Sequence, residues 1–244
     1  MAITTAEIKY IKSLSQKKFR DEYGVFAVEG EKMVSEALKS GFTVEKVYRK
    51  DEIGDAAMAR ISALSSPSPV LAVVRKPEVP FEAPGKGLYL ALDGIRDPGN
   101  LGTILRISDW FGIDAVYASE DTVELYNPKV VQSTMGAIFR VRFHYADIPA
   151  LCSSALKAGG RVYGTFLDGE NMYGKELSNG TQAPSVIVIG NEANGISPAT
   201  AACVSDRLFI PPFPADDPGS ESINAAVATA ITVAEFRRQN CRKR

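Results

Sequence analysis

The feature that most constrains the fold is a regular alternation of short apolar runs with amphipathic stretches. Apolar runs of strand length lie at 87–94, 114–119 and 185–191, and residues with helical spacing of apolar side chains lie between them. Strands that are apolar on both sides and alternate with helices are typical of a mostly parallel sheet covered on both faces. The sequence therefore predicts an α/β fold.

A stretch rich in Pro and Gly at 76–87 predicts a linker between two parts of the chain. We expect a small α/β domain over 1–80 and a larger domain over 86–244. The small domain has predicted strands at 24–30, 44–50 and 69–77, and predicted helices at 8–24, 31–41, with Gly41 as C-cap, and 51–64.

Composition excludes several classes of protein. No apolar run approaches the roughly 20 residues of a membrane span, and the first residues lack the apolar core of a secretory signal. The three cysteines are far apart, which fits a reducing cytoplasm and indicates neither a disulfide framework nor a metal site. The single histidine, His144, excludes most zinc sites, and we expect it at the surface end of a strand. A net charge of −1 does not by itself indicate nucleic-acid binding.

Three polar loops follow predicted strands, where ligands collect in parallel sheets. The first, 92–106, has a turn signal at Asp97–Asn100 that places Asn100 at a helix entrance, with Arg106 six residues later. In the second, 186–197, Gly190 and Gly195 bracket Glu192, and glycine there permits close approach of a ligand to the backbone. Each loop alone also reads as an ordinary turn or cap.

The third polar loop, 208–228, is rich in proline and enters a predicted helix at about 221. The first turn of that helix carries Ser220, Ser222 and Asn224, and a helix entrance offers free N–H groups. A capped helix after a proline loop is again the simpler interpretation. It does not explain three such loops in one half of the chain.

The three loops together resemble the motifs of the SpoU (TrmH-like) branch of the SPOUT RNA methyltransferases. The segments are DPGNLGTILR, IGNEANGI and IPPF followed by SINAAVATAI, and the match covers about 88–240. The segment FAVEGEKMVSEALKSG resembles the small substrate-binding domain that often precedes this domain. The last motif usually has Ser where this chain has Ala226, which removes one hydroxyl.

The resemblance implies an α/β fold with a C-terminal trefoil knot, a homodimer with its site near the subunit interface, and no metal. It implies transfer of a methyl group from S-adenosylmethionine to a ribose 2′-hydroxyl of RNA. By motif position, the residues implied to be catalytic or to handle the substrate are Asn100, Arg106, Glu192, Ser222 and Asn224. Those implied to contact the cofactor are Thr165, Gly190, Ile210 and Ile223.

Arg106 is the residue that the resemblance assigns to activation of the hydroxyl. Because guanidinium stays protonated, our hypothesis is that Arg106 grips the neighbouring phosphate and stabilises the developing alkoxide. Glu192 is expected to orient Arg106 in preference to acting as a general base.

The N-terminal domain is expected to recognise RNA through a basic face with nearby aromatic rings, although a solvated helix with buried aromatics explains it equally well. The residues of this face are Lys9, Lys12, Lys17, Lys18 and Arg20, with Tyr10, Phe19 and Tyr23. We favour rRNA over tRNA as substrate. The alternatives are an RNA-binding protein of this fold without turnover and a base-directed methyltransferase. The missing G-x-G-x-x-G fingerprint disfavours a dehydrogenase.

Overall fold

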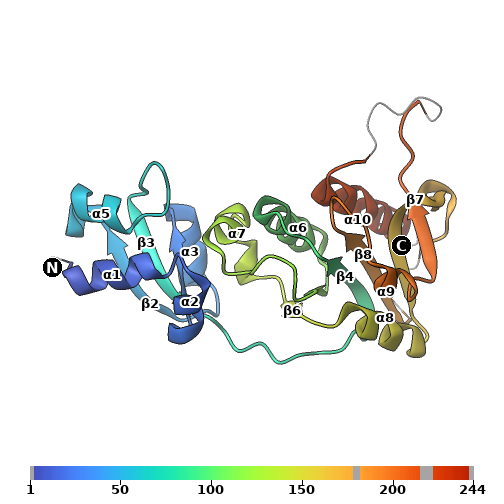
Figure 1. Ribbon diagram of the computed structural model, residues 1–244, viewed down its shortest axis with the longest axis horizontal. Helices are drawn as coiled ribbons and strands as arrows, with labels where there is room; N and C mark the ends of the chain where they lie inside the picture. The colour runs from blue at the N-terminus through green and yellow to red at the C-terminus, as the bar shows by residue number, and fades with distance from the viewer. Residues whose placement is uncertain (1–2, 178–181, 215–221, 242–244) are drawn as a thin grey trace. The chain divides into compact units, whose positions relative to one another are not determined.

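The computed structural model describes residues 3–177, 182–214 and 222–241. Contacts divide these residues into two compact units (Figure 1). Unit 1 comprises the chain up to Glu78 together with Glu124–Arg140, and unit 2 comprises Val79–Val123 and the chain from Val141 onward. Sequence neighbourhood alone does not show that the 124–140 segment packs with the N-terminal part.

Unit 1 contains a three-stranded antiparallel sheet in the order β1-β3-β2. The sequence predicts a small α/β domain here without a strand direction, and the structure supplies it. Strands β1 and β2 run in the same direction, and β3 lies between them in the opposite direction. The strands are β1 (Val25–Glu29), β2 (Val44–Arg49) and β3 (Val70–Arg75).

The helices of unit 1 are shorter than the sequence predicts. The stretch 8–24 forms two helices separated by a turn, and Gly54, at φ 83°, separates two more. The C-cap of the third helix is Ser40 rather than Gly41. The helices are α1 (Thr5–Ser13), α2 (Lys17–Tyr23), α3 (Glu31–Lys39), α4 (Lys50–Ile53), α5 (Asp55–Ile61), α7 (Pro128–Ser133) and the 3₁₀ turn η1 (Ala137–Phe139).

Arg20 anchors the 124–140 segment within unit 1. Its side chain is 2% exposed, and its guanidinium donates to the Glu124 carboxylate and to the Leu14 carbonyl oxygen at 2.7 Å. The ammonium of Lys76 lies 3.9 Å from Glu124. Arg20 was expected on the basic RNA-binding face, and this prediction is wrong because the side chain forms a buried ion pair.

Unit 2 contains a six-stranded parallel sheet in the order β6-β5-β4-β8-β7-β9, which confirms the predicted parallel architecture. Leu90, Ile187 and Val188 of the two central strands are 0% exposed, as expected for strands covered on both faces. The strands are β4 (Gly87–Asp93), β5 (Ala115–Ala118), β6 (Phe143–Tyr145), β7 (Arg161–Asn171), β8 (Pro184–Gly190) and β9 (Asp206–Phe209).

Two pairs of helices cover this sheet (Figure 1). Helix α6 packs against α10 on one face, while α8 and α9 contact each other on the other. Helix α10 begins at residue 225 rather than near 221, and Ser220 lies outside the described residues. No helix in the described part of the chain is long and apolar enough to cross a membrane. The elements are α6 (Pro98–Phe111), α8 (Ile148–Lys157), α9 (Pro198–Ala201), α10 (Ala225–Cys241) and the 3₁₀ turn η2 (Met172–Gly174).

Candidate active site

The centre of the unit 2 sheet contains the point at which ligands bind in open α/β folds. Strands β4 and β8 are neighbours and end level with each other, with Asp93 opposite Gly190. The next helices along the chain, α6 after β4 and α9 after β8, lie on opposite faces of the sheet. Open α/β folds bind ligands at such a point, beyond the carboxyl ends of the strands.

The loop after β4 leads directly into α6. Asp97 is the N-cap, and its carboxylate accepts a hydrogen bond from the Asn100 N–H at 2.8 Å. Pro98, at the first helical position, has a fixed φ that suits a helix start. Asn100 therefore lies inside the first turn instead of at the cap, and its side chain is free to point elsewhere.

The loop after β8 folds back on itself at once. Asn191 and Gly195 exchange backbone hydrogen bonds at 2.9 Å. A Cβ on Gly190 would lie 2.3 Å from the Gly195 carbonyl carbon, so only glycine fits. Glycine was expected at position 190 so that a ligand could approach the backbone. In the structure it is the backbone of Gly195 that approaches Gly190, and this contact excludes a side chain. The Asn191 amide also donates to the Gly94 carbonyl oxygen at 2.6 Å, which joins the first two loops.

The third loop contributes the cap of α10. The Asn224 side-chain oxygen accepts hydrogen bonds from the N–H groups of Ala226 at 2.9 Å and Val227 at 3.3 Å. Ala226, which replaces the usual Ser of the motif, is 5% exposed. A serine hydroxyl at this buried position would need a hydrogen-bond partner, whereas the methyl group of Ala226 packs without one.

A chain of hydrogen bonds between side chains joins the three loops. The Asn224 amide donates to the Asn100 side-chain oxygen at 2.8 Å, and the Asn100 amide donates to the Glu192 carboxylate. An ionised carboxylate only accepts, so the Glu192 end fixes the orientation of both amides. Residues from three distant motifs thus meet at one point, as the sequence predicts.

Arg106 is not part of this chain of hydrogen bonds. It is exposed on α6, and six residues of helix turn it about 120° away from Asn100. Within the described residues Arg106 has no hydrogen-bond or ion-pair partner, and the Glu192 carboxylate binds Asn100 instead. Arg106 does share a helix face with Trp110, one turn later, which is 84% exposed.

The residues expected to contact the cofactor lie at the same edge of the sheet. Thr165 of β7 is opposite Leu208, and Ile210 follows the end of β9. The pairing of β7 with β8 brings Thr165 within one residue of the level of Gly190. Ser222 and Ile223 precede Asn224, the cap of α10, and Ile223 is 47% exposed. Apolar side chains beside the ends of strands suit a nucleoside, so this set fits the expected cofactor.

His144 does not belong to the site. It is 7% exposed in β6, its ring stacks 5.5 Å from that of Tyr117, and Phe81 lies 5.7 Å away. Burial lowers the pKa of His144, which favours the neutral imidazole. The predicted surface position is therefore wrong. The residues that the structure describes include no group of three or more His, Cys, Asp or Glu arranged to hold a metal ion.

Three further residues shape the loops, and these roles were not predicted for them from the sequence. Asp97 caps α6, Asn191 joins two loops, and the Asp93 carboxylate accepts a hydrogen bond from the Ser197 N–H at 2.8 Å. The signal for Asp97 was present, because Asp before Pro-Gly is typical of a capped helix start. Asp93 is the last residue of β4 and Asn191 directly follows β8, positions that indicate a site but do not identify the hydrogen-bond partner.

Two family models match the chain. The model of the SpoU rRNA Methylase family matches residues 87–234, and that of the MRM3-like substrate binding domain matches residues 5–76. The 23S rRNA (guanosine(2553)-2′-O)-methyltransferase RlmP of Bacillus subtilis is 30% identical, with 95% of this chain and 96% of that protein covered.

Solved structures agree with these matches. The AdoMet-bound rRNA methyltransferase of Sinorhizobium meliloti is 28% identical with a TM-score of 0.85, and the alignment covers 98% of this chain and 96% of that chain. The AdoMet complex of the SpoU methyltransferase AviRb of Streptomyces viridochromogenes has a TM-score of 0.82 at 22% identity, covering 98% and 99%. The second likeness concerns the fold alone.

Proposed function

The chain belongs to the SpoU rRNA methylase family, and we propose from this premise that it transfers a methyl group from S-adenosylmethionine to a ribose 2′-hydroxyl of RNA. The observation that carries the proposal is the hydrogen-bonded chain Asn224–Asn100–Glu192 at the carboxyl edge of the sheet. It holds three loops in one arrangement beside the residues that fit the cofactor. Large-subunit rRNA is the substrate we favour, since the relatives named above act on rRNA.

The chemistry requires alignment of the hydroxyl and stabilisation of developing charge. S-adenosylmethionine, when bound, supplies an electrophilic methyl group on sulfur. Thr165, Gly190, Ile210 and Ile223 would hold it at the ends of the strands, partly through backbone groups. Alignment of reacting groups contributes up to roughly 7–11 kcal/mol in ideal cases, which makes the rigidity of the three loops the main contribution of the fold.

Arg106 is proposed to bind the phosphate next to the reacting ribose and to stabilise the alkoxide as it forms. Its proton-bearing guanidinium suits both tasks and cannot serve as a base. The proton leaves through phosphate or water. We assign to Glu192 the task of orienting Asn100, whose amide it binds, in place of the orientation of Arg106 that was expected.

The direct test is incubation of the full chain with RNA and S-adenosylmethionine labelled in the methyl group. We expect label in rRNA and, after nuclease digestion and mass analysis, in a 2′-O-methylated nucleoside. Label in a base would instead support the base-directed alternative. Binding of RNA and cofactor without any transfer would support the alternative without turnover.

We also propose a homodimer that uses the exposed face of α6. Trp110 is 84% exposed on α6, and tryptophan is a frequent anchor residue of protein–protein contacts. Val227, on the adjacent helix α10, is 49% exposed. A dimer formed through this face places Arg106 at the subunit boundary, in agreement with its separation from Asn100 in one chain.

Trp110→Glu is expected to convert the dimer to monomers in light scattering, because the introduced carboxylate would be buried at the contact without a partner. The control is Leu167→Glu, which also places a charge on an exposed apolar residue, but on β7. A monomeric wild-type chain, or dissociation by the control alone, would contradict this interface.

Other expectations remain part of the proposal. We propose a cytoplasmic location, a trefoil knot near the C-terminus, and a division of labour between domains over 1–80 and 86–244, the second of which contributes its 124–140 segment to unit 1. The placement of β8 between β4 and β7 supports a non-sequential threading of the chain.

RNA contact by the N-terminal domain is also proposed. It is supported by exposed side chains on the predicted basic face, which are those of Lys9, Lys12, Lys17, Lys18 and Tyr23.

A further inference from the structure

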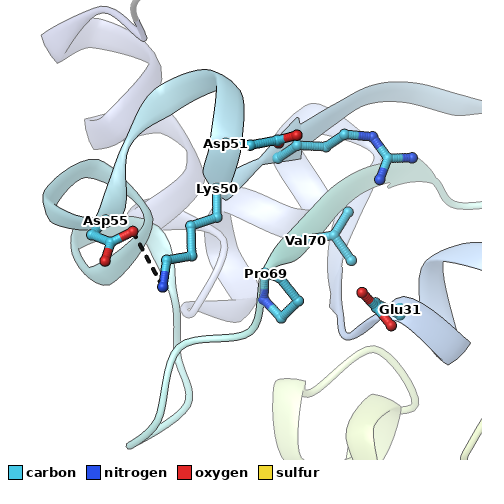
Figure 2. Close-up of a pocket in the computed structure, with 7 residues that line it drawn as sticks. Glu31, Lys50, Asp51, Asp55, Pro69 and Val70 are labelled. Carbon is cyan, nitrogen blue, oxygen red and sulfur yellow. Dashed lines mark ion pairs between the residues drawn. The ribbon is translucent and has the colours of Figure 1, made fainter.

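An open cavity of unit 1 lies where β1 and β2 end and β3 begins (Figure 2). Its volume is about 350 Å³, and Pro69 and Val70 form its apolar floor. The Gly30 N–H donates to the Val70 carbonyl oxygen at 3.0 Å, and the Lys50 N–H donates to that of Pro69 at 2.8 Å. The carbonyl oxygens of the floor therefore already accept hydrogen bonds within the chain, so a ligand would be bound mainly by side chains.

Three charged side chains of this cavity have no hydrogen-bond or ion-pair partner in the described part of the chain, those of Asp51, Glu31 and Arg49, and the last two are of opposite sign. Glu31 begins α3 after β1, and Arg49 ends β2, so they come from strands on either side of β3. Lys50, by contrast, is paired with Asp55 at 3.2 Å (Figure 2).

We propose that this cavity binds one unpaired nucleotide of the RNA substrate, with guanine preferred, an inference that rests on the proposed function. RNA is read mainly at unstacked bases through their hydrogen-bonding edges. Guanine presents two adjacent N–H donors on its Watson–Crick edge, which match the Glu31 carboxylate. Arg49 binds the phosphate through its planar fork, and the base lies on the apolar floor.

The charges that line the cavity favour a single nucleotide over the phosphate backbone of a duplex as its ligand. Asp51 and Asp55 also line the cavity, so acidic side chains outnumber basic ones. A surface that bound only phosphates would need the opposite balance. One guanidinium beside several carboxylates suits a single phosphate joined to a base rich in donors.

The test measures binding of the full chain to a short oligouridine RNA with one central guanosine, and to the same RNA with adenosine there, by fluorescence anisotropy. We expect the wild type to prefer the guanosine RNA. Glu31→Gln should remove most of that preference, about tenfold, and leave adenosine binding unchanged. Arg49→Ala should weaken binding of both RNAs. Exposed residues of the same unit outside the cavity, changed in Glu52→Gln and Arg60→Ala, are the controls.

A wild type without preference, an unchanged preference in Glu31→Gln, or unchanged affinities in Arg49→Ala would overturn the proposal. Methyl transfer to rRNA is measured on the same preparations. If the wild type transfers methyl groups while the oligonucleotide results are negative, the cavity assignment fails and the proposed function stands. If no methyl group is transferred, the proposed function fails whichever way the oligonucleotides bind.

Discussion

Arg106→Lys lowers kcat for methyl transfer by at least about a hundredfold, which is the magnitude expected when one preorganised donor to a developing oxyanion is lost. Lysine keeps the positive charge but cannot donate two parallel hydrogen bonds to a phosphate. Because Arg106 is exposed and has no partner in the described residues, its replacement should leave folding and cofactor affinity unchanged. Single-turnover kinetics and cofactor titration measure the two effects separately.

The matched control for this experiment is Arg142→Lys. Arg142 is an exposed arginine of the same unit and pairs with Glu82 at 2.9 Å, an interaction that lysine can keep. The control should retain wild-type turnover. Near-wild-type turnover in Arg106→Lys itself would exclude a bidentate guanidinium role and leave only a contribution from its charge.

Glu124→Gln is expected to destabilise unit 1 by about 3 kcal/mol, because it leaves the Arg20 guanidinium buried without its counter-ion. The double variant Arg20→Met with Glu124→Gln should recover much of this loss, since it removes the buried charge that Glu124→Gln alone leaves without a partner. Lys17→Met, at the exposed pair with Asp21, is the control and should cost less than about 1 kcal/mol.

The measurement has to report on unit 1 specifically. The single tryptophan, Trp110, belongs to unit 2, so its fluorescence would follow the wrong part of the chain. Hydrogen exchange of amides in α1, α2 and the 124–140 segment gives the local free energy of opening. Equal protection in Glu124→Gln and the wild type would show that the charge pair does not hold the segment.

The sequence predicts the convergence of the three loops but not their bonding partners. Parallel strands bring their carboxyl ends to one edge, and this rule places Asn100, Glu192 and Asn224 near one another. It does not say that the Asn224 amide meets Asn100, because that contact joins residues 124 positions apart. The position of Arg106 relative to them depends on where α6 begins, which Asp97 sets.

Unit 1 shows where sequence patterns are insufficient. Arg20 lies in a basic run that resembles a solvated face, and only the arrival of Glu124 from far along the chain makes its burial possible. The direction of β3 was equally hidden, because β3 is buried on both faces, a pattern typical of parallel strands, although both of its neighbours run antiparallel to it.

Because the 124–140 segment belongs to unit 1, the protein cannot be divided into its two units by cutting the chain at one place. The peptide chain passes between the units near residues 78, 123 and 140, so one cut cannot release either of them whole. A fragment that starts at Val79 would expose Val130 and Val131, which α7 buries against β1. A fragment that stops at Glu78 would lack the acid that neutralises Arg20. A form of the N-terminal unit that keeps the Arg20–Glu124 ion pair is therefore discontinuous, and it requires residues 124–140 to be grafted on or supplied in trans.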